Sequence, residues 1–79
     1  MRTQTLFGTK IRIEEVDGTN YAILEDVCDA LDLTQNQVIK ILDVNLKAAR
    51  VKVNIGQRYV YMTAIDEKNI DDLLYHYLN

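Results

Sequence analysis

Hydrophobic and polar residues alternate in the first third of the chain, with the period of two that is typical of β-strands. Two turn signals interrupt the alternation, Gly8-Thr9 and Asp17-Gly18, and an Asp-Gly pair strongly indicates a two-residue hairpin loop. The alternation also breaks at Glu15-Val16, where we expect a bulge or the end of a strand. The pattern therefore predicts a three-stranded meander, with strands at residues 3–7, 10–14 and 20–24.

Apolar residues then recur at helical spacing over two short segments. The first segment, residues 25–32, has carboxylates in its first turn, where they favour the positive end of the helix dipole. Thr34 and Gln37 match a capping box, so we expect a second helix to begin here and run to about Leu42. We expect residues 43–49 to form a loop or a loose turn. The predicted inward-facing positions are Val27, Ala30, Leu31, Val38, Ile41 and Leu42.

The clearest division into two faces lies in residues 50–62. Gly56-Gln57 divides this segment, because glycine suits the first central position of a hairpin turn. A two-residue loop here pairs Lys52 with Tyr61 and leaves one face apolar and one face polar. The apolar face consists of Val51, Val53, Val60 and Met62. The polar face consists of Arg50, Lys52, Asn54, Tyr59 and Tyr61.

A last helix is predicted from Thr63 to about Leu78, with Thr63 as its cap and Asp66 near its positive end. Its apolar stripe consists of Ile65, Ile70, Leu73, Leu74 and Tyr77. Together the elements predict a small α+β fold over residues 1–79, in a single domain. The meander and the hairpin would share one small antiparallel sheet, and three short helices would pack on it.

The composition fits one soluble domain and excludes some kinds of chemistry. The chain has 79 residues, of which 48% are hydrophobic and 27% are charged, which argues against a disordered chain. It contains no serine nucleophile, and the single cysteine, Cys28, excludes an internal disulfide and a zinc site built from thiolates. No apolar run approaches the roughly 18 residues that cross a bilayer, and the start lacks the apolar stretch of a signal peptide. We therefore expect a cytoplasmic protein with no membrane partner.

Catalysis is the weakest interpretation of the titratable residues. His76 is the only histidine, and general acid–base catalysis needs a positioned partner. Cys28 lies between Asp26 and Asp29, whose charges would raise the pKa of the thiol, so we expect a buried structural cysteine. Neither these carboxylates nor those near the C-terminus have the spacing of a calcium loop. We expect a non-enzymatic protein with no catalytic residue, no metal site and no cofactor.

The net charge of −3 conceals an uneven distribution of charge. Residues 33–63 carry five cations and one carboxylate, a local charge of +4, whereas residues 1–32 sum to −4 and residues 64–79 to −3. Two short helices followed by a basic ribbon is the order of a helix-turn-helix with a wing, and the major groove admits a helix or a two-stranded ribbon. We therefore expect double-stranded DNA as a partner.

The second helix and the hairpin would share the contacts with DNA. Glutamine and asparagine side chains on the helix can bond adenine edges, and a lysine can meet guanine or phosphate. On the hairpin, cations would meet phosphates and tyrosines would offer hydroxyl groups or stacking faces. The candidate residues are Gln35, Asn36, Lys40, Lys47, Arg50, Lys52, Arg58, Tyr59 and Tyr61. The alternative is a solvated amphipathic hairpin beside two packing helices, with no nucleic-acid contact.

One region of the sequence resembles a known family. Leu6-Phe7-Gly8 followed by Ile11-Arg12, and then residues 21–31 with the string Glu-Asp-Val-Cys-Asp-Ala-Leu, are similar to the N-terminal domain of BRO-type phage and viral proteins. The resemblance implies the DNA-binding part of a phage antirepressor or transcription regulator acting in the host cell, without defining base-reading residues. Two departures are the absence of the family's usual C-terminal domain and Tyr21 in place of a common tryptophan.

A function of another class also fits the charge pattern. The carboxylates near the C-terminus form either a solvated face or a surface for a basic partner. In the second case the protein would inhibit a regulatory or DNA-binding protein through its acidic helices. A small domain with about five cations binds DNA weakly by itself, so a repressor-like protein partner and a homodimer are further expectations. The residues concerned are Asp66, Glu67, Asp71 and Asp72.

Overall fold

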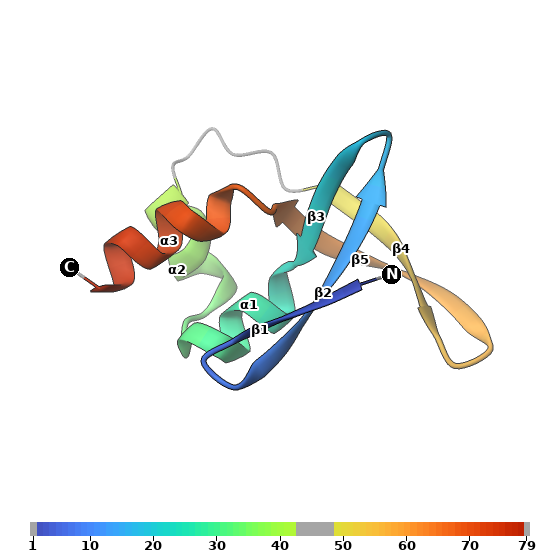
Figure 1. Cartoon of the computed structure of the whole chain (residues 1–79), viewed down its shortest axis with the longest axis horizontal. Helices are drawn as coiled ribbons and strands as arrows, with labels where there is room; N and C mark the ends of the chain where they lie inside the picture. Colours follow the sequence, from blue (N-terminus) through green and yellow to red (C-terminus); the bar gives the residue numbers. More distant parts are fainter. Residues whose placement is uncertain (1, 43–48, 79) are drawn as a thin grey trace.

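A five-stranded antiparallel sheet forms the centre of the structure, and three helices lie to one side of it (Figure 1). The computed structural model describes residues 2–42 and 49–78. The strands follow the order β1-β2-β3-β5-β4 within the sheet, so the meander and the hairpin share one sheet and the α+β prediction is confirmed. The elements are β1 (Arg2–Leu6), β2 (Thr9–Val16), β3 (Thr19–Ile23), α1 (Leu24–Leu31), α2 (Gln35–Leu42), β4 (Ala49–Ile55), β5 (Arg58–Asp66) and α3 (Asn69–Leu78).

Both turns of the meander are two-residue loops whose central residues have positive φ. Asp17 and Gly18 adopt φ values of 51° and 83°, as the Asp-Gly pair predicts. The first turn consists of Phe7 and Gly8, with φ values of 49° and 80°, and Thr9 already belongs to β2. The prediction of a Gly8-Thr9 turn is thus wrong by one residue. The sequence does not indicate Phe7 as a turn residue, because a bulky side chain is uncommon in the left-handed region.

Strand β2 continues through Glu15 and Val16, where the loss of alternation predicts a bulge or a strand end. The two residues pair in regular register with Asn20 and Thr19 of β3. Both side chains are exposed, because this end of the hairpin extends beyond the packed part of the sheet. The hydrophobic–polar alternation of the sequence is therefore lost because neither face of the sheet is covered at this end of β2. The pairing between β2 and β3 itself is unbroken.

The main core lies between the sheet and the helices. Hydrophobic side chains from β2, β3 and β5 share one face of the sheet, and all three helices pack against them. The buried members are Ile11, Ile13, Ala22, Leu24, Val27, Cys28, Leu31, Val38, Ile65, Ile70 and Leu73. The predicted inward positions are confirmed, with Ala30, Ile41 and Leu42 partly buried against this cluster.

A smaller core lies on the opposite face of the sheet. It consists of Ile23, Val51, Val53 and Ala64, with Tyr21 and Met62 packed against it. Strand β4 also approaches β2, although β3 and β5 lie between them in the sheet. This approach shows that the sheet curls, and the curl buries the apolar side of the β4–β5 hairpin without a helix on that face.

The start of the last helix differs from the prediction. Thr63 and Asp66 belong to β5, and α3 begins only at Asn69. The strand continues because Ala64 and Ile65 pair with β3 and are buried on opposite faces of the sheet. Asp66 accepts a hydrogen bond from the backbone N–H of Lys68 (3.0 Å), and this side-chain turn leads the chain into the helix.

The predicted capping box at the start of α2 is confirmed. The Gln37 N–H donates to Thr34 Oγ1 at 3.1 Å, and the Thr34 N–H donates to Gln37 Oε1 at 2.8 Å. The preceding helix, α1, ends at Leu31, and the next residue, Asp32, caps it in a left-handed conformation with φ 55°. These two caps define the short connection between α1 and α2, close to the predicted boundaries.

An ion pair between Arg12 of β2 and Asp26 of α1 joins the sheet to the helices. Arg12 Nε donates to Asp26 Oδ2 at 2.8 Å and Arg12 Nη2 donates to Oδ1 at 2.9 Å, a bidentate arrangement. The backbone N–H of Arg12 also donates to Oδ2 at 3.0 Å. Asp26 is only 8% exposed, so it does not belong to a solvated acidic face, although it recurs at three-residue spacing with Asp29 and Asp32.

The pair shifts the pKa values of both side chains. Burial acts to raise the pKa of Asp26, but the hydrogen bonds from the Arg12 side chain and backbone, together with its charge, outweigh burial and lower this pKa. The hydrogen bond to Asp26 raises the pKa of Arg12. A lowered carboxyl pKa means that ionised Asp26 stabilises the folded state above the unfolded-state pKa of about 3.9.

Replacing the carboxylate tests this contribution. We expect Asp26→Asn to lower the free energy of unfolding by about 3 kcal/mol near pH 7, because it leaves a partly buried guanidinium without its counter-ion. In the wild type, this stabilisation is lost as the pH falls from about 4 to values below the lowered pKa of Asp26. The difference in unfolding free energy between the two proteins therefore becomes smaller in acid. Urea denaturation at several pH values measures the unfolding free energies of the two proteins. Asp29→Asn, at an exposed position of the same helix, is the control, and an equal effect of the two substitutions would contradict the assignment.

Candidate nucleic-acid interface

The β4–β5 hairpin projects from the body of the domain, at the lower right of Figure 1. Its loop is Gly56-Gln57, with Gly56 at φ 67°, as the sequence predicts. The predicted register is also confirmed, since Lys52 pairs with Tyr61 and Val53 with Val60. Regular pairing holds every side chain of the hairpin on a defined face.

The polar hairpin face consists of Arg50, Lys52, Asn54, Tyr59 and Tyr61, which are all exposed. Tyr59 and Tyr61 are 62% and 61% exposed, which is unusual for such large side chains. On the opposite face, Val51 and Val53 are buried in the smaller core. The burial of the valines therefore fixes which side of the hairpin is presented to solvent.

The cations of the hairpin are not neutralised by carboxylates. The sequence contains no Asp or Glu from residue 44 to residue 65. Arg50 Nη2 donates to the carbonyl oxygen of Tyr61 at 3.3 Å, and Lys52 Nζ lies 4.4 Å from the ring centroid of Tyr59. Among the described residues, the ion pairs involve only Arg2 and Arg12 as cations. The charges of the hairpin therefore remain available to an anionic ligand.

Arg58 is exposed at the tip of the hairpin but does not share the polar hairpin face. It pairs with Ile55, and the alternation of side chains places it on the same side as Val60. The predicted two-residue loop already implies that Arg58 lies on the same side as Val60, because it pairs Arg58 with Ile55. Asn54 is the residue of the polar hairpin face that the list of DNA-binding candidates omits, although the alternation of residues 50–54 identifies it.

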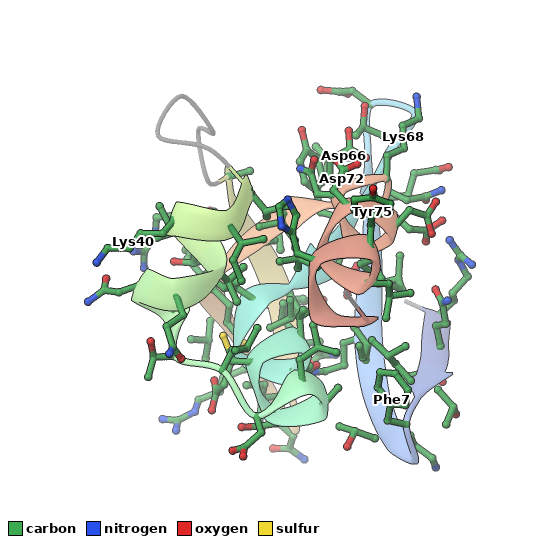
Figure 2. All side chains as sticks on the ribbon, turned by 90° about the vertical axis from the view of Figure 1, so that its left-hand side faces the viewer. Phe7, Lys40, Asp66, Lys68, Asp72 and Tyr75 are labelled. Atoms are coloured by element: carbon green, nitrogen blue, oxygen red, sulfur yellow. The ribbon has the colours of Figure 1, made fainter. Side chains whose placement is uncertain are left out.

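The candidate residues of α2 form a separate group. Gln35, Asn36 and Lys40 are exposed, and Lys40 points outward from the helix (Figure 2). The helix packs against α1 and α3, and in Figure 1 it lies at the opposite end of the long axis from the hairpin tip. The structure therefore does not bring these side chains together with the tip of the ribbon. Lys47 lies outside the described residues.

The two residues considered for catalysis lie in different environments. Cys28 is buried within the main core, as predicted, and is 8% exposed. Burial is the main cause that raises the pKa of its thiol, and the charges of Asp29 and Glu25 add to the effect. His76 is exposed on α3, with its ring edge-on to that of Tyr75.

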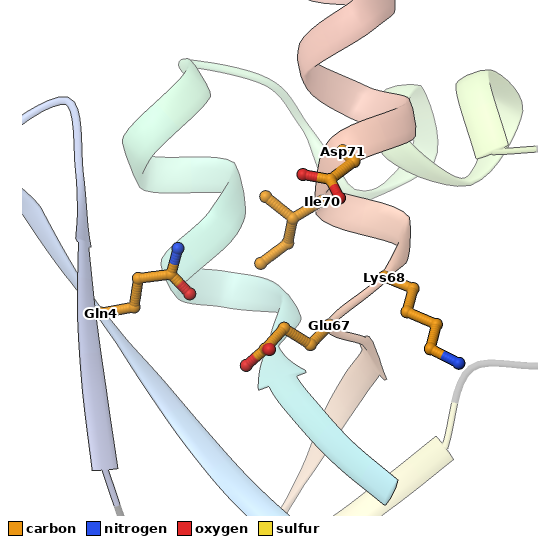
Figure 3. Close-up of a pocket in the computed structure, with 5 residues that line it drawn as sticks. All are labelled: Gln4, Glu67, Lys68, Ile70 and Asp71. Carbon is orange, nitrogen blue, oxygen red and sulfur yellow. The ribbon is translucent and has the colours of Figure 1, made fainter.

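Shallow hollows lie beside the turn that precedes α3 and the adjoining strands, among the residues that the structure describes. Figure 3 shows one of about 160 Å³, lined by Gln4, Glu67, Lys68, Ile70 and Asp71. Its carboxylate Glu67 forms an ion pair with Arg2. Within residues 2–42 and 49–78, no cluster of three or more histidine, cysteine or acidic side chains could hold a metal ion. The walls of this hollow thus carry the charged side chains of Glu67, Lys68 and Asp71.

Comparisons with known proteins give no match: no family model fits the chain, and no curated protein or solved structure is significantly similar. In the part of the chain that the structure describes, no helix is long and apolar enough to cross a membrane. The surface of the protein itself is therefore the basis on which a function is proposed.

The burial of Cys28 predicts slow chemical modification. We expect iodoacetamide to alkylate the native protein at pH 8 at least about ten times more slowly than the protein unfolded in guanidinium chloride, because reaction needs an exposed thiolate. Mass spectrometry at timed intervals measures the two rates. Equal rates would contradict a buried, unreactive cysteine and would reopen a chemical role for it.

Proposed function

We propose that this protein is a non-enzymatic DNA-binding module that contacts duplex DNA through its β4–β5 hairpin. The observation that carries the proposal is the set of exposed cations Arg50, Lys52 and Arg58 on residues 49–65 of the hairpin, a segment without Asp or Glu. Cations without acidic partners are the groups that replace the counter-ions of DNA phosphates. A two-stranded ribbon also has the dimensions that the major groove admits.

The two faces of the hairpin suggest how its contacts would be divided. Arg50 and Lys52 project from the polar hairpin face, whereas Arg58 lies at the tip on the other side. A ribbon that enters a groove meets phosphates on both walls, so cations on both sides suit this mode of docking. Tyr59 and Tyr61 would add hydroxyl donors to the phosphate or base edges.

Helix α2 would act as a second, separate contact. Gln35 and Asn36 carry side chains that can bond adenine edges, and Lys40 can meet phosphate. Its position away from the hairpin tip means that one duplex site must be long or bent to touch both elements. We therefore assign the hairpin the main contribution to affinity, and α2 an additional contribution to sequence preference.

The biological setting of the proposal comes from the resemblance to BRO-type proteins. That resemblance favours a phage or prophage transcription regulator or antirepressor, acting in the cytoplasm of the host cell. A module with a few phosphate contacts has modest affinity, since each contact adds only about 0.9 to the slope of binding against salt. Regulation by such a module would use a second copy of the chain or a protein partner to reach tight binding.

Charge reversal on the hairpin tests the proposal. We expect the double variant Lys52→Glu with Arg58→Glu to bind duplex DNA at least about ten times more weakly than the wild type at about 50 mM salt, and to reduce the salt slope by about two. Fluorescence anisotropy with a labelled duplex at about 50 mM and about 200 mM salt measures affinity and slope.

The double variant Lys10→Glu with Lys68→Glu is the matched control. It has the same net charge as the hairpin variant, but its exposed cations lie on β2 and before α3. We expect it to keep most of the affinity for DNA. No binding by the wild type at low salt, or equal losses in the two variants, would refute a DNA contact at the hairpin.

A second candidate function uses the acidic surface instead. Asp71 and Asp72 are exposed in the first turn of α3, and Asp71 lines the hollow in Figure 3. Such a surface is complementary to a basic protein, which would make this chain an inhibitor of a regulatory or DNA-binding protein. If the wild type fails to bind duplex DNA in the experiment above, this becomes the leading candidate.

A further inference from the structure

Two tyrosine rings lie exposed on the same face of one strand. Tyr59 and Tyr61 are two residues apart on β5, so their side chains leave the strand on the same side, roughly 7 Å apart. Both are more than half exposed, and neither belongs to a hydrophobic core cluster. The fold therefore keeps two flat, partly apolar surfaces in water at a fixed spacing.

The spacing of these two side chains along β5 suits single-stranded nucleic acid better than a duplex. Successive bases in a duplex are about 3.4 Å apart along each strand and cover one another's faces. A protein ring can meet only base edges in such a stack, and its own face stays unused. Two tyrosine side chains that leave a strand roughly 7 Å apart instead fit two unstacked bases of an extended single strand, because every base has a face that can stack on an aromatic ring.

The cations beside the rings suit the backbone of such a strand. Lys52 is the cross-strand neighbour of Tyr61, and its ammonium group lies 4.4 Å from the centroid of the Tyr59 ring. Arg50 is held next to them by its hydrogen bond to the Tyr61 carbonyl. A base on either ring would therefore place its phosphate near a cation with no carboxylate partner, which is the combination found in surfaces that bind single strands.

We propose that the polar hairpin face binds single-stranded DNA, with two successive bases stacked on Tyr59 and Tyr61 and the connecting phosphates beside Lys52 and Arg50. This inference rests on the proposed function only in taking the hairpin as the nucleic-acid contact. It adds a ligand class, since the module would hold an unpaired strand, or a duplex that has opened locally, by its bases.

The experiment compares a fluorescein-labelled oligothymidylate of about 12 nucleotides with a duplex of the same length, by fluorescence anisotropy at low salt. We expect the wild type to bind the oligothymidylate at least as tightly as the duplex. Tyr59→Ala and Tyr61→Ala should each weaken binding of the single strand by about tenfold, the scale of one lost base stack. They should weaken binding of the duplex by only about two- to threefold, the scale of one lost hydroxyl contact. Tyr59→Phe and Tyr61→Phe should retain the binding, because they keep the ring.

The control variant is Tyr75→Ala, which removes an exposed tyrosine from α3 and should leave binding of the single strand unchanged. Circular dichroism checks that each variant is folded. Binding of the duplex without binding of the oligothymidylate would overturn this inference and leave the proposed function intact. Failure to bind either ligand would overturn both. Equal affinities of the wild type and the two alanine hairpin variants for the oligothymidylate would refute stacking on these rings.

Discussion

The contact between Arg12 and Asp26 is the constraint on which the arrangement of sheet and helices depends. Helix α1 begins directly after β3, with no intervening loop, and the pairing of β2 with β3 stops at Ile13 and Ala22. The backbone N–H of Arg12 donates to Asp26 instead, so a side chain completes the edge that a strand would otherwise fill. Hydrophobic burial has no preferred direction, whereas three directed hydrogen bonds fix α1 against β2, and α2 packs in turn on α1.

The same contact illustrates how the acidic residues of a chain with net charge −3 are distributed. Asp26 neutralises Arg12, Glu67 neutralises Arg2, and Asp66 holds the turn before α3. These carboxylates act as structural partners in the body of the domain. Residues 49–65 of the hairpin contain no Asp or Glu, so the cations in this segment have no carboxylate beside them in the sequence. The net charge of the chain therefore does not describe the local field of the projecting hairpin, which is positive.

Local signals in the sequence predict the hairpin, its loop, its register and the capping box of α2, because neighbouring residues determine each of them. The failures have longer-range causes. The last four residues of β5 look like the start of a helix until the pairing of Ala64 and Ile65 with β3 is known. Asp26 looks like a surface residue until Arg12 is placed beside it. The separation of α2 from the hairpin tip follows from packing on α1 and α3, which no short motif encodes.

The position of β4 at the edge of the sheet has a consequence for behaviour at high concentration. An outer strand offers unpaired backbone groups to any other strand, and long, flat, hydrophobic edges promote aggregation. Arg50 and Lys52 place two like charges along this edge, which disfavours its pairing with the same edge of another molecule. The cations that we propose to hold nucleic acid thus also disfavour growth into extended sheets, and we expect their neutralisation to lower solubility at high protein concentration.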